Sequence, residues 1–285
     1  MSQRYLSASP PALGQPSILD LLDLEQVEEN LYRSCVVVER PWALYGGQVA
    51  AQALYAAGST VPAGRLPHSL HGYFLRSGSA ARPTVFEVYR DRDGRSFSAR
   101  RVVAIQGGEV IFNMSASFAV PRAGAEHDAG VMPDVPAPDE MPAVDHPYHV
   151  SMETRPASAD QLDWRVPTRF WCRSAVGLPD DDLVHACVLT YMSDLSTGLI
   201  PLEGGDTETG PSLDHAVWFH RRLRLDDWVL IDLAAQTVAG GRGWYTGVFY
   251  GADGTRLASI AQETLFGPHH RAQGDRGRID AAARP

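Results

Sequence analysis

The stretches DGRSFSARRVVAIQGGEVIFNMSASF (Asp93 to Phe118) and GGRGWYTGVFYGADGTRLASIAQETLF (Gly240 to Phe266) share one pattern, and this internal repeat decides the fold. Each stretch has a Gly-Arg entry, a strand, a turn that contains Gly, and a second strand that ends in Phe. The offset between the copies is 147 residues at the Gly-Arg entry and 148 residues at the terminal Phe. One added residue in the second turn accounts for the difference, so we infer a duplication.

The repeat extends upstream of these strand pairs. SLHGYFLR (69–76) resembles SLDHAVWFHR (212–221), and each is preceded by a segment with helical character. The predicted helices are GGQVAAQALYAAGST (46–60) in the first copy and DDLVHACVLTYMSDLSTG (181–198) in the second. Each copy therefore has the same order of elements, a helix followed by a series of strands.

The strands between these blocks are expected to pair in an antiparallel manner. TVFEVYR (84–90) and WVLIDLAAQT (228–237) are rich in β-branched and aromatic residues. Asp-Gly pairs at 93–94 and 253–254 supply turn chemistry between strands. A helix followed by antiparallel strands predicts an α+β fold in which a sheet wraps around a helix.

The pattern predicts four regions. A first repeat spans 15–120 and a second spans 161–268, with a linker at 121–160 and a loose polar tail at 269–285. The linker prediction rests on 121–147, where Pro, Ala and acidic residues are dense, because such composition disfavours regular structure.

Composition and charge narrow the function classes. The chain has 285 residues, of which 44% are hydrophobic, enough for a sizeable core. It has no run of about 18 apolar residues and no signal-peptide core, so we expect a cytoplasmic protein without a membrane partner. The net charge of −9 disfavours a nucleic-acid partner, because such binding relies on neutralising phosphates. Cys35, Cys172 and Cys187 form no Cys-x-x-Cys pair, so we interpret them as packing residues and expect no zinc or redox centre.

One acidic residue interrupts the second predicted helix. At about 100° per residue, Asp194 lies about 20° from Cys187 and so faces the core or its edge. A buried carboxylate needs hydrogen bonds, protonation or a wet cavity, and the first helix has no acid between 46 and 60. Packing alone therefore does not require Asp194. The apolar stripe beside it consists of Val184, Cys187, Val188, Tyr191 and Leu195.

Two further polar residues stand out when the copies are aligned. Matching the terminal Phe residues places Gln262 opposite Met114, on a strand face that is otherwise apolar. Ser212 matches Ser69. Asp194, Ser212 and Gln262 could form one active site per duplicated chain. The alternative is that Asp194 caps a helix end or a loop and that Gln262 lies on an exposed edge.

Several blocks resemble the acyl-CoA thioesterase II family. They are YGGQVAAQALYAA, HSLHGYFLR, GRSFSARRVVAIQ, YMSDLS, LDHAVWFHR and ASIAQE, and the similarity runs from about residue 20 to residue 268. The resemblance implies a double hotdog fold, two tandem units that each wrap an antiparallel sheet around a long helix. It also implies hydrolysis of fatty acyl-CoA to free acid and CoA, with no cofactor apart from the CoA of the substrate.

The family's catalytic set falls on Asp194, Ser212 and Gln262, the residues that the repeat comparison also singles out. The chain departs from the family pattern at Ser212, where Thr is usual, and the segment 203–211 is shorter. Serine keeps the hydroxyl but lacks the methyl group that restricts χ1. In this hypothesis Asp194 is a general base for water, and Ser212 and Gln262 hold that water.

Other functions remain open at this stage. Ser212 as a covalent nucleophile would need a G-x-S-x-G turn and a partner histidine, but it lies in G-P-S-L-D with His215 three residues on. His68, His71 and the 269–270 pair lack metal-ligand spacing. A double-hotdog enoyl-CoA hydratase would need an Asp and His pair in a motif that is absent. A catalytically weak acyl-CoA binding protein is the other alternative. The expected partners are acyl-CoA and further copies of the chain in a homo-oligomer.

Overall fold

The computed structural model describes residues 16–37, 43–144, 150–161 and 167–268. These residues contain three α-helices and one antiparallel sheet of 13 strands. The elements of the N-terminal half are α1 (Ile18–Leu22), β1 (Leu24–Glu28), β2 (Leu31–Ser34), α2 (Gly46–Gly58), β3 (Leu66–Phe74), β4 (Val85–Asp93), β5 (Phe97–Gln106) and β6 (Glu109–Ala119).

The elements of the C-terminal half follow in a similar order. They are the short 3-10 helix η1 (Pro138–Glu140), β7 (Met152–Pro156), η2 (Ala159–Gln161), β8 (Arg169–Ser174), α3 (Asp182–Met192), η3 (Ile200–Leu202), β9 (Thr207–Ser212), β10 (Asp214–Phe219), β11 (Val229–Ala239), β12 (Arg242–Gly251) and β13 (Arg256–Pro268). The predicted linker, 121–160, thus includes η1 and β7. The predicted tail, 269–285, lies outside the described residues.

The order of strands in the sheet is the same in both halves when read outward from the centre. The path is β1-β2-β4-β5-β6-β3-β10-β13-β12-β11-β8-β7, and β9 pairs with the end of β13. β3 and β10 join the halves through antiparallel pairs such as Leu70 with Val217. Both halves therefore follow one topology, as the repeat predicts.

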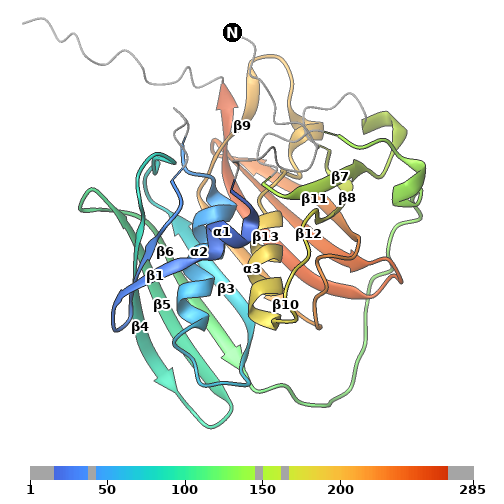
Figure 1. The fold of residues 1–285 in the computed structure, drawn as a ribbon. Helices are drawn as coiled ribbons and strands as arrows, with labels where there is room; N and C mark the ends of the chain where they lie inside the picture. Colours follow the sequence, from blue (N-terminus) through green and yellow to red (C-terminus); the bar gives the residue numbers. More distant parts are fainter. Residues whose placement is uncertain (1–15, 38–42, 145–149, 162–166, 269–285) are drawn as a thin grey trace, which may run out of the picture.

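The two long helices lie side by side in the hollow of the curved sheet (Figure 1). They run antiparallel, because the start of α2 contacts the end of α3 and the end of α2 contacts the start of α3. Their buried faces and the inner strand faces form one core, in which Leu54, Phe86, Val188 and Phe249 are fully buried. The α+β fold of two helices wrapped by an antiparallel sheet is confirmed.

The hairpins that carry the repeat differ in register. The sequence alignment equates Val102 and Met114 with Phe249 and Gln262, and in the first hairpin Val102 pairs with Met114. In the second, Gln262 pairs with Tyr245, four residues before Phe249. The alignment is therefore wrong along one strand. A two-residue Gly-Gly turn closes the first hairpin, whereas a longer connection closes the second, and connection length sets the register.

The connection between the halves packs on the outer face of the second half. Met132 and Val135 contact a buried cluster formed by Ala157, Trp171, Leu230 and Tyr250. The indole N–H of Trp171 donates a hydrogen bond of 2.9 Å to the backbone oxygen of Pro136. This segment thereby covers apolar side chains that β8, β11 and β12 turn away from the helices.

Candidate active site

Asp194 lies directly after α3, which ends earlier than the apolar stripe predicts. The prediction of helix through Gly198 is wrong, because α3 ends at Met192 and Ser193 is its C-cap. The sequence Ser-Asp-Leu-Ser-Thr explains the early end, since short polar side chains compete for backbone hydrogen bonds. Asp194 still faces inward, as predicted, although it lies beyond the helix, and its side chain borders a cavity.

The start of α2 approaches the carboxylate of Asp194 closely. A Cβ atom on Gly46 would lie 2.5 Å from Asp194 Oδ2, and one on Gly47 would lie 2.5 Å from the backbone oxygen of Tyr191. The N–H of Gly47 donates a hydrogen bond to the Asp194 carboxylate. Only glycine permits this contact between the two helices. The pair was visible in the sequence at the start of a predicted helix, but nothing there linked it to Asp194.

Gln262 connects Asp194 to Ser212. Its Nε2 donates to Asp194 Oδ1 at 2.9 Å and to Ser212 Oγ at 2.6 Å. Gln262 lies on β13, and Ser212 is the last residue of β9, which pairs with β13 at Thr264. Gln262 is buried, so the alternative of an exposed edge residue is wrong. The three residues that the sequence singled out therefore meet at one place.

His215 is a fourth polar residue at this place, and the sequence reasoning did not assign it to the site. Its side chain is 1% exposed. Nδ1 forms a very short hydrogen bond with Gln262 Oε1, and Nε2 lies 2.7 Å from Ser193 Oγ. The sequence held one signal: His215 alternates with Val217 and Phe219 along a strand, which predicts that its side chain faces inward.

Burial dominates the electrostatics of this cluster. Desolvation raises the pKa of Asp194, and hydrogen bonds from Gln262, Gly47 and Ser212 together with the nearby His215 act in the opposite direction. Desolvation lowers the pKa of His215, against the attraction of Asp194. A carboxyl group with a raised pKa is a stronger base than an ordinary aspartate, and the neutral form of His215 is favoured.

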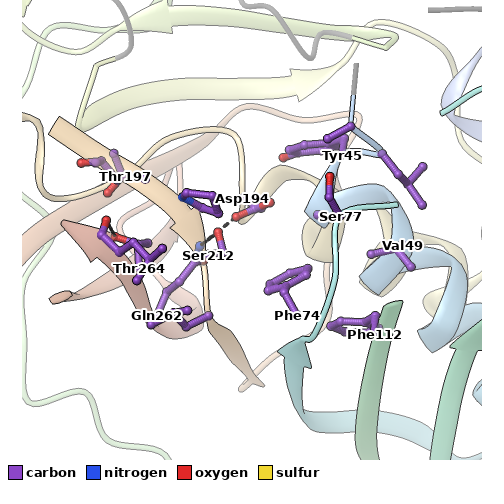
Figure 2. A pocket seen from close by; sticks show the side chains of 18 of the residues that line it. Tyr45, Val49, Phe74, Ser77, Phe112, Asp194, Thr197, Ser212, Gln262 and Thr264 are labelled. Atoms are coloured by element: carbon purple, nitrogen blue, oxygen red, sulfur yellow. Dashed lines mark hydrogen bonds between the residues drawn. The ribbon is translucent and has the colours of Figure 1, made fainter. Parts of the chain in front are cut away.

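The cluster opens into a cavity of about 1020 Å³ (Figure 2). The cavity has two kinds of wall. Apolar side chains from the N-terminal half line one part: Leu44, Val49, Phe74, Ile111 and Phe112. The C-terminal half contributes hydroxyl and acidic side chains along with some apolar ones. The polar ones are Thr197, Glu203, Glu208, Thr209 and Thr264, and the apolar ones include Leu195, Ile200, Leu213 and Leu265. Asp194, Ser212 and Gln262 lie where the two halves of the chain meet.

Phe74 lies close to the start of α2. A Cβ atom on Gly46 would lie 3.0 Å from the ring of Phe74, and the rings of Phe74 and Phe112 have centroids 5.0 Å apart. His68 and His71 do not line the cavity. His68 Nε2 bonds Ser117 Oγ at 2.8 Å, and His71 stacks edge-on against Trp218. The 269–270 pair lies outside the described residues.

Comparisons with known proteins identify the class. The model for "Acyl-CoA thioesterase N-terminal domain" matches residues 38–119, and the model for "Acyl-CoA thioesterase C-terminal domain" matches residues 126–266. The fold and the paired domain matches define a double-hotdog thioester hydrolase. Both models describe thioesterase domains and neither describes a hydratase, so the class is thioester hydrolase rather than enoyl-CoA hydratase.

Individual relatives agree with the class. Acyl-CoA thioesterase 2 of Haemophilus influenzae is 32% identical over 277 residues, covering 88% of this chain and 96% of the relative. Acyl-coenzyme A thioesterase 8 of Rattus norvegicus is 33% identical over 282 residues, covering 87% and 88%. The crystal structure of acyl-CoA thioesterase II TesB2 from Mycobacterium marinum has a TM-score of 0.77 and 40% identity, covering 89% of this chain and 99% of that one. The chain belongs to the acyl-CoA thioesterase II family, and it hydrolyses acyl-CoA thioesters.

Proposed function

We propose that this chain hydrolyses fatty acyl-CoA with a water molecule that Asp194 activates and that Ser212 and Gln262 hold. The observation that carries the proposal is the single amide of Gln262, which donates to both Asp194 and Ser212 at the wall of the cavity. This arrangement leaves lone pairs of the carboxylate and of the serine hydroxyl for a water molecule.

The reaction proceeds without a covalent enzyme intermediate. Asp194 takes a proton from the water as its oxygen attacks the thioester carbonyl carbon. The tetrahedral intermediate then expels the CoA sulfur as the C–S bond breaks, and Asp194 returns the proton to that sulfur. The products are a free acid and CoA. General-base catalysis of this kind contributes about 10²- to 10⁴-fold. No cofactor is needed beyond the CoA of the substrate.

The start of α2 supplies the oxyanion site in this proposal. Gly46 lines the cavity beside Asp194, and α2 directs the positive end of its dipole there. Backbone N–H groups at a helix N-terminus stabilise negative charge, and one such donor contributes about 10²- to 10³-fold in acyl transfer. The N–H of Gly46 is the donor that we assign.

The two walls of the cavity give the substrate an orientation. The acyl chain lies against the apolar wall of the N-terminal half, where its burial contributes about 0.8 kcal/mol per CH₂. The polar pantetheine arm lies along the threonine-lined wall of the C-terminal half. The thioester carbonyl then falls between them, beside Gly46 and Asp194.

Thiol release from saturated acyl-CoA substrates of increasing chain length tests the proposal. We expect wild type to release CoA and Asp194→Asn to lose about 10²- to 10⁴-fold in kcat with its fold intact. Ser212→Thr restores the usual family residue and keeps the hydroxyl, so it is expected to stay active, whereas Ser212→Ala is expected to be impaired. Circular dichroism checks the fold of each variant.

Two outcomes contradict the proposal. Full activity of Asp194→Asn would show that another group activates the water. Capture of an acyl group on the protein by rapid acid quenching would indicate covalent catalysis by Ser212.

Within the described ranges, no helix combines the length and apolar composition that crossing a membrane requires. The cytoplasmic location, the homo-oligomer and the domain boundaries at 120 and 160 stay predictions.

A further inference from the structure

His215 lies behind the proposed catalytic residues and does not line the cavity. It projects inward from β10, and both of its ring nitrogens have partners, Gln262 Oε1 at Nδ1 and Ser193 Oγ at Nε2. A fully buried imidazole with two specific partners has a defined orientation, so its protons can be placed by counting donors and acceptors.

The hydrogen bonds of Gln262 determine the tautomer of His215. Both hydrogens of Gln262 Nε2 are used by Asp194 and Ser212, so its Oε1 faces the imidazole. An amide oxygen only accepts, and Nδ1 must therefore carry the proton. In the neutral ring, which burial favours by lowering the pKa, Nε2 is then an acceptor.

Ser193 completes the chain of hydrogen bonds. Its Oγ lies 2.7 Å from His215 Nε2 and 2.8 Å from the backbone oxygen of Thr190, and it has one proton for the two. With a neutral ring, that proton points to Nε2. Every donor then faces the same way, from Ser193 through His215 and Gln262 to Asp194.

We propose that His215 is a positioning residue for hydrolysis, because its Nδ1–H holds the amide of Gln262 with Nε2 toward Asp194 and Ser212. The inference rests on the proposed function of those three residues. Without the imidazole the amide can rotate by 180°, which places its oxygen against the carboxylate and leaves Ser212 without its donor. Ser193 acts one step further back, by donating to His215 Nε2 and so supporting the tautomer that Gln262 sets.

The charged and titratable groups near these hydrogen bonds come from two strands and a loop. They are Asp194 after α3, His215 and Asp214 on β10, and Tyr245 on β12. Burial raises the pKa of Tyr245, so its phenol is neutral, and its hydroxyl donates to Ser196 O at 3.3 Å. A shift in the acidic limb of the pH–rate profile for thiol release therefore reports a change in the protonation of Asp194 and its partners.

The test compares His215→Ala with His215→Asn in steady-state thiol release across pH. Asn can place a side-chain N–H near the position of Nδ1. We expect His215→Ala to lose about 10- to 100-fold in kcat, since a buried partner is left unsatisfied, while KM changes less than about threefold. The acidic limb moves to higher pH, because the Asp194 carboxylate loses the hydrogen bond that stabilised its charge. His215→Asn recovers most of the rate and the limb.

Matched controls separate positioning from folding. His220, which directly follows β10, is exposed and bonds Ser259 Oγ at 2.9 Å, so His220→Ala is expected to keep the wild-type rate. Ser193→Ala is expected to lose about threefold to tenfold, less than His215→Ala, because Gln262 still sets the tautomer of His215. Thermal unfolding is measured for each variant.

Three results would overturn the inference. One is a wild-type kcat and acidic limb in His215→Ala. Another is a folded His215→Asn that is as slow as His215→Ala, since the donor would then be irrelevant. The third is full activity of Asp194→Asn, which removes the proposed function and this inference with it, whereas the first two leave the proposed function standing.

Discussion

The two ends of the α2 and α3 helix pair are built from the same elements and do different things. At one end, the start of α2 meets the end of α3 through Gly46 and Asp194, and a cavity opens. At the other end, Leu183 at the start of α3 packs against Gly58 at the end of α2. The first end holds the proposed reaction, and the second is filled by a side chain.

The carboxylates near the two helix ends also differ, because their pKa values shift in opposite directions. Asp194 has a raised pKa, because desolvation outweighs its hydrogen bonds. Asp93 has a lowered pKa, chiefly because Ser98 donates to it, with the guanidinium of Arg100 also acting. The buried Arg100 donates to Thr60 Oγ1 at 2.8 Å and to Asp93 at 2.9 Å. The same duplicated architecture therefore holds, at one end, a carboxylate whose ionisation is unfavourable and, at the other end, a stabilising ion pair.

The largest expected difference between the two helix ends comes from adding one methyl group at each of them. Gly46→Ala places a Cβ 2.5 Å from Asp194 Oδ2, so the carboxylate must move. Because a misplacement of about 1 Å can cost 10²-fold, we expect kcat for thiol release to fall about a hundredfold with little change in stability.

Gly58→Ala is the matched change at the closed end. Its Cβ would lie 2.4 Å from Leu183 Cδ1, so a core side chain must shift. We expect a loss of about 1–2 kcal/mol in the free energy of unfolding, measured by denaturant titration, and a wild-type kcat. Equal effects of the two variants on kcat would erase the functional difference between the helix ends.

A smaller expected effect distinguishes Asp194 from Asp93 by the pH dependence of their contributions to stability. The raised pKa of Asp194 means that its ionisation costs stability, so its contribution is most favourable below the unfolded pKa of about 4 and is lost as pH rises through the folded pKa. Asp194→Asn is therefore expected to raise the Tm at pH 7 by about 2–4 °C, the shift that 1 kcal/mol produces in a chain of this size. The gain disappears below about pH 4.

Asp93 has the opposite sign. Its lowered pKa contributes stability above the unfolded pKa, and that stability is lost as pH falls through the folded pKa. Asp93→Asn is expected to lower the Tm at pH 7 and to leave kcat unchanged. Thermal unfolding of both variants between pH 4 and pH 8 provides the test. A decrease in Tm for Asp194→Asn at pH 7 would contradict the raised pKa.

The smallest expected effect tests whether the two walls of the cavity contact different parts of the substrate. Phe74→Ala removes a ring beside Gly46 from the apolar wall and is expected to shift the acyl-CoA chain-length optimum by a few carbons, seen in kcat/KM. Thr264→Val, on the opposite wall, keeps the side-chain volume and is expected to keep the optimum. A shift produced by Thr264→Val alone would reverse the proposed orientation of the substrate.

Much of the fold was predictable because it depends on patterns within single segments. Helical periodicity located α2 and α3, and alternation and turn residues located the strands. The inward orientation of Asp194 was predicted as well, but the helical angle behind that prediction does not apply, because α3 ends at Met192. The hairpin register was not predictable, since it depends on how each connection closes.

The sequence by itself determined the duplication, the order of elements and three candidate residues of the site. Only the tertiary structure decided that Gly46 and Gly47 approach Asp194, that His215 holds Gln262, and that one helix end is open while the other is filled by Leu183. The physical reason is that periodicity reports which face of a segment is buried. It carries no information on which distant segment will pack there, and that depends on side-chain volumes at the contact, including the volume that glycine leaves free.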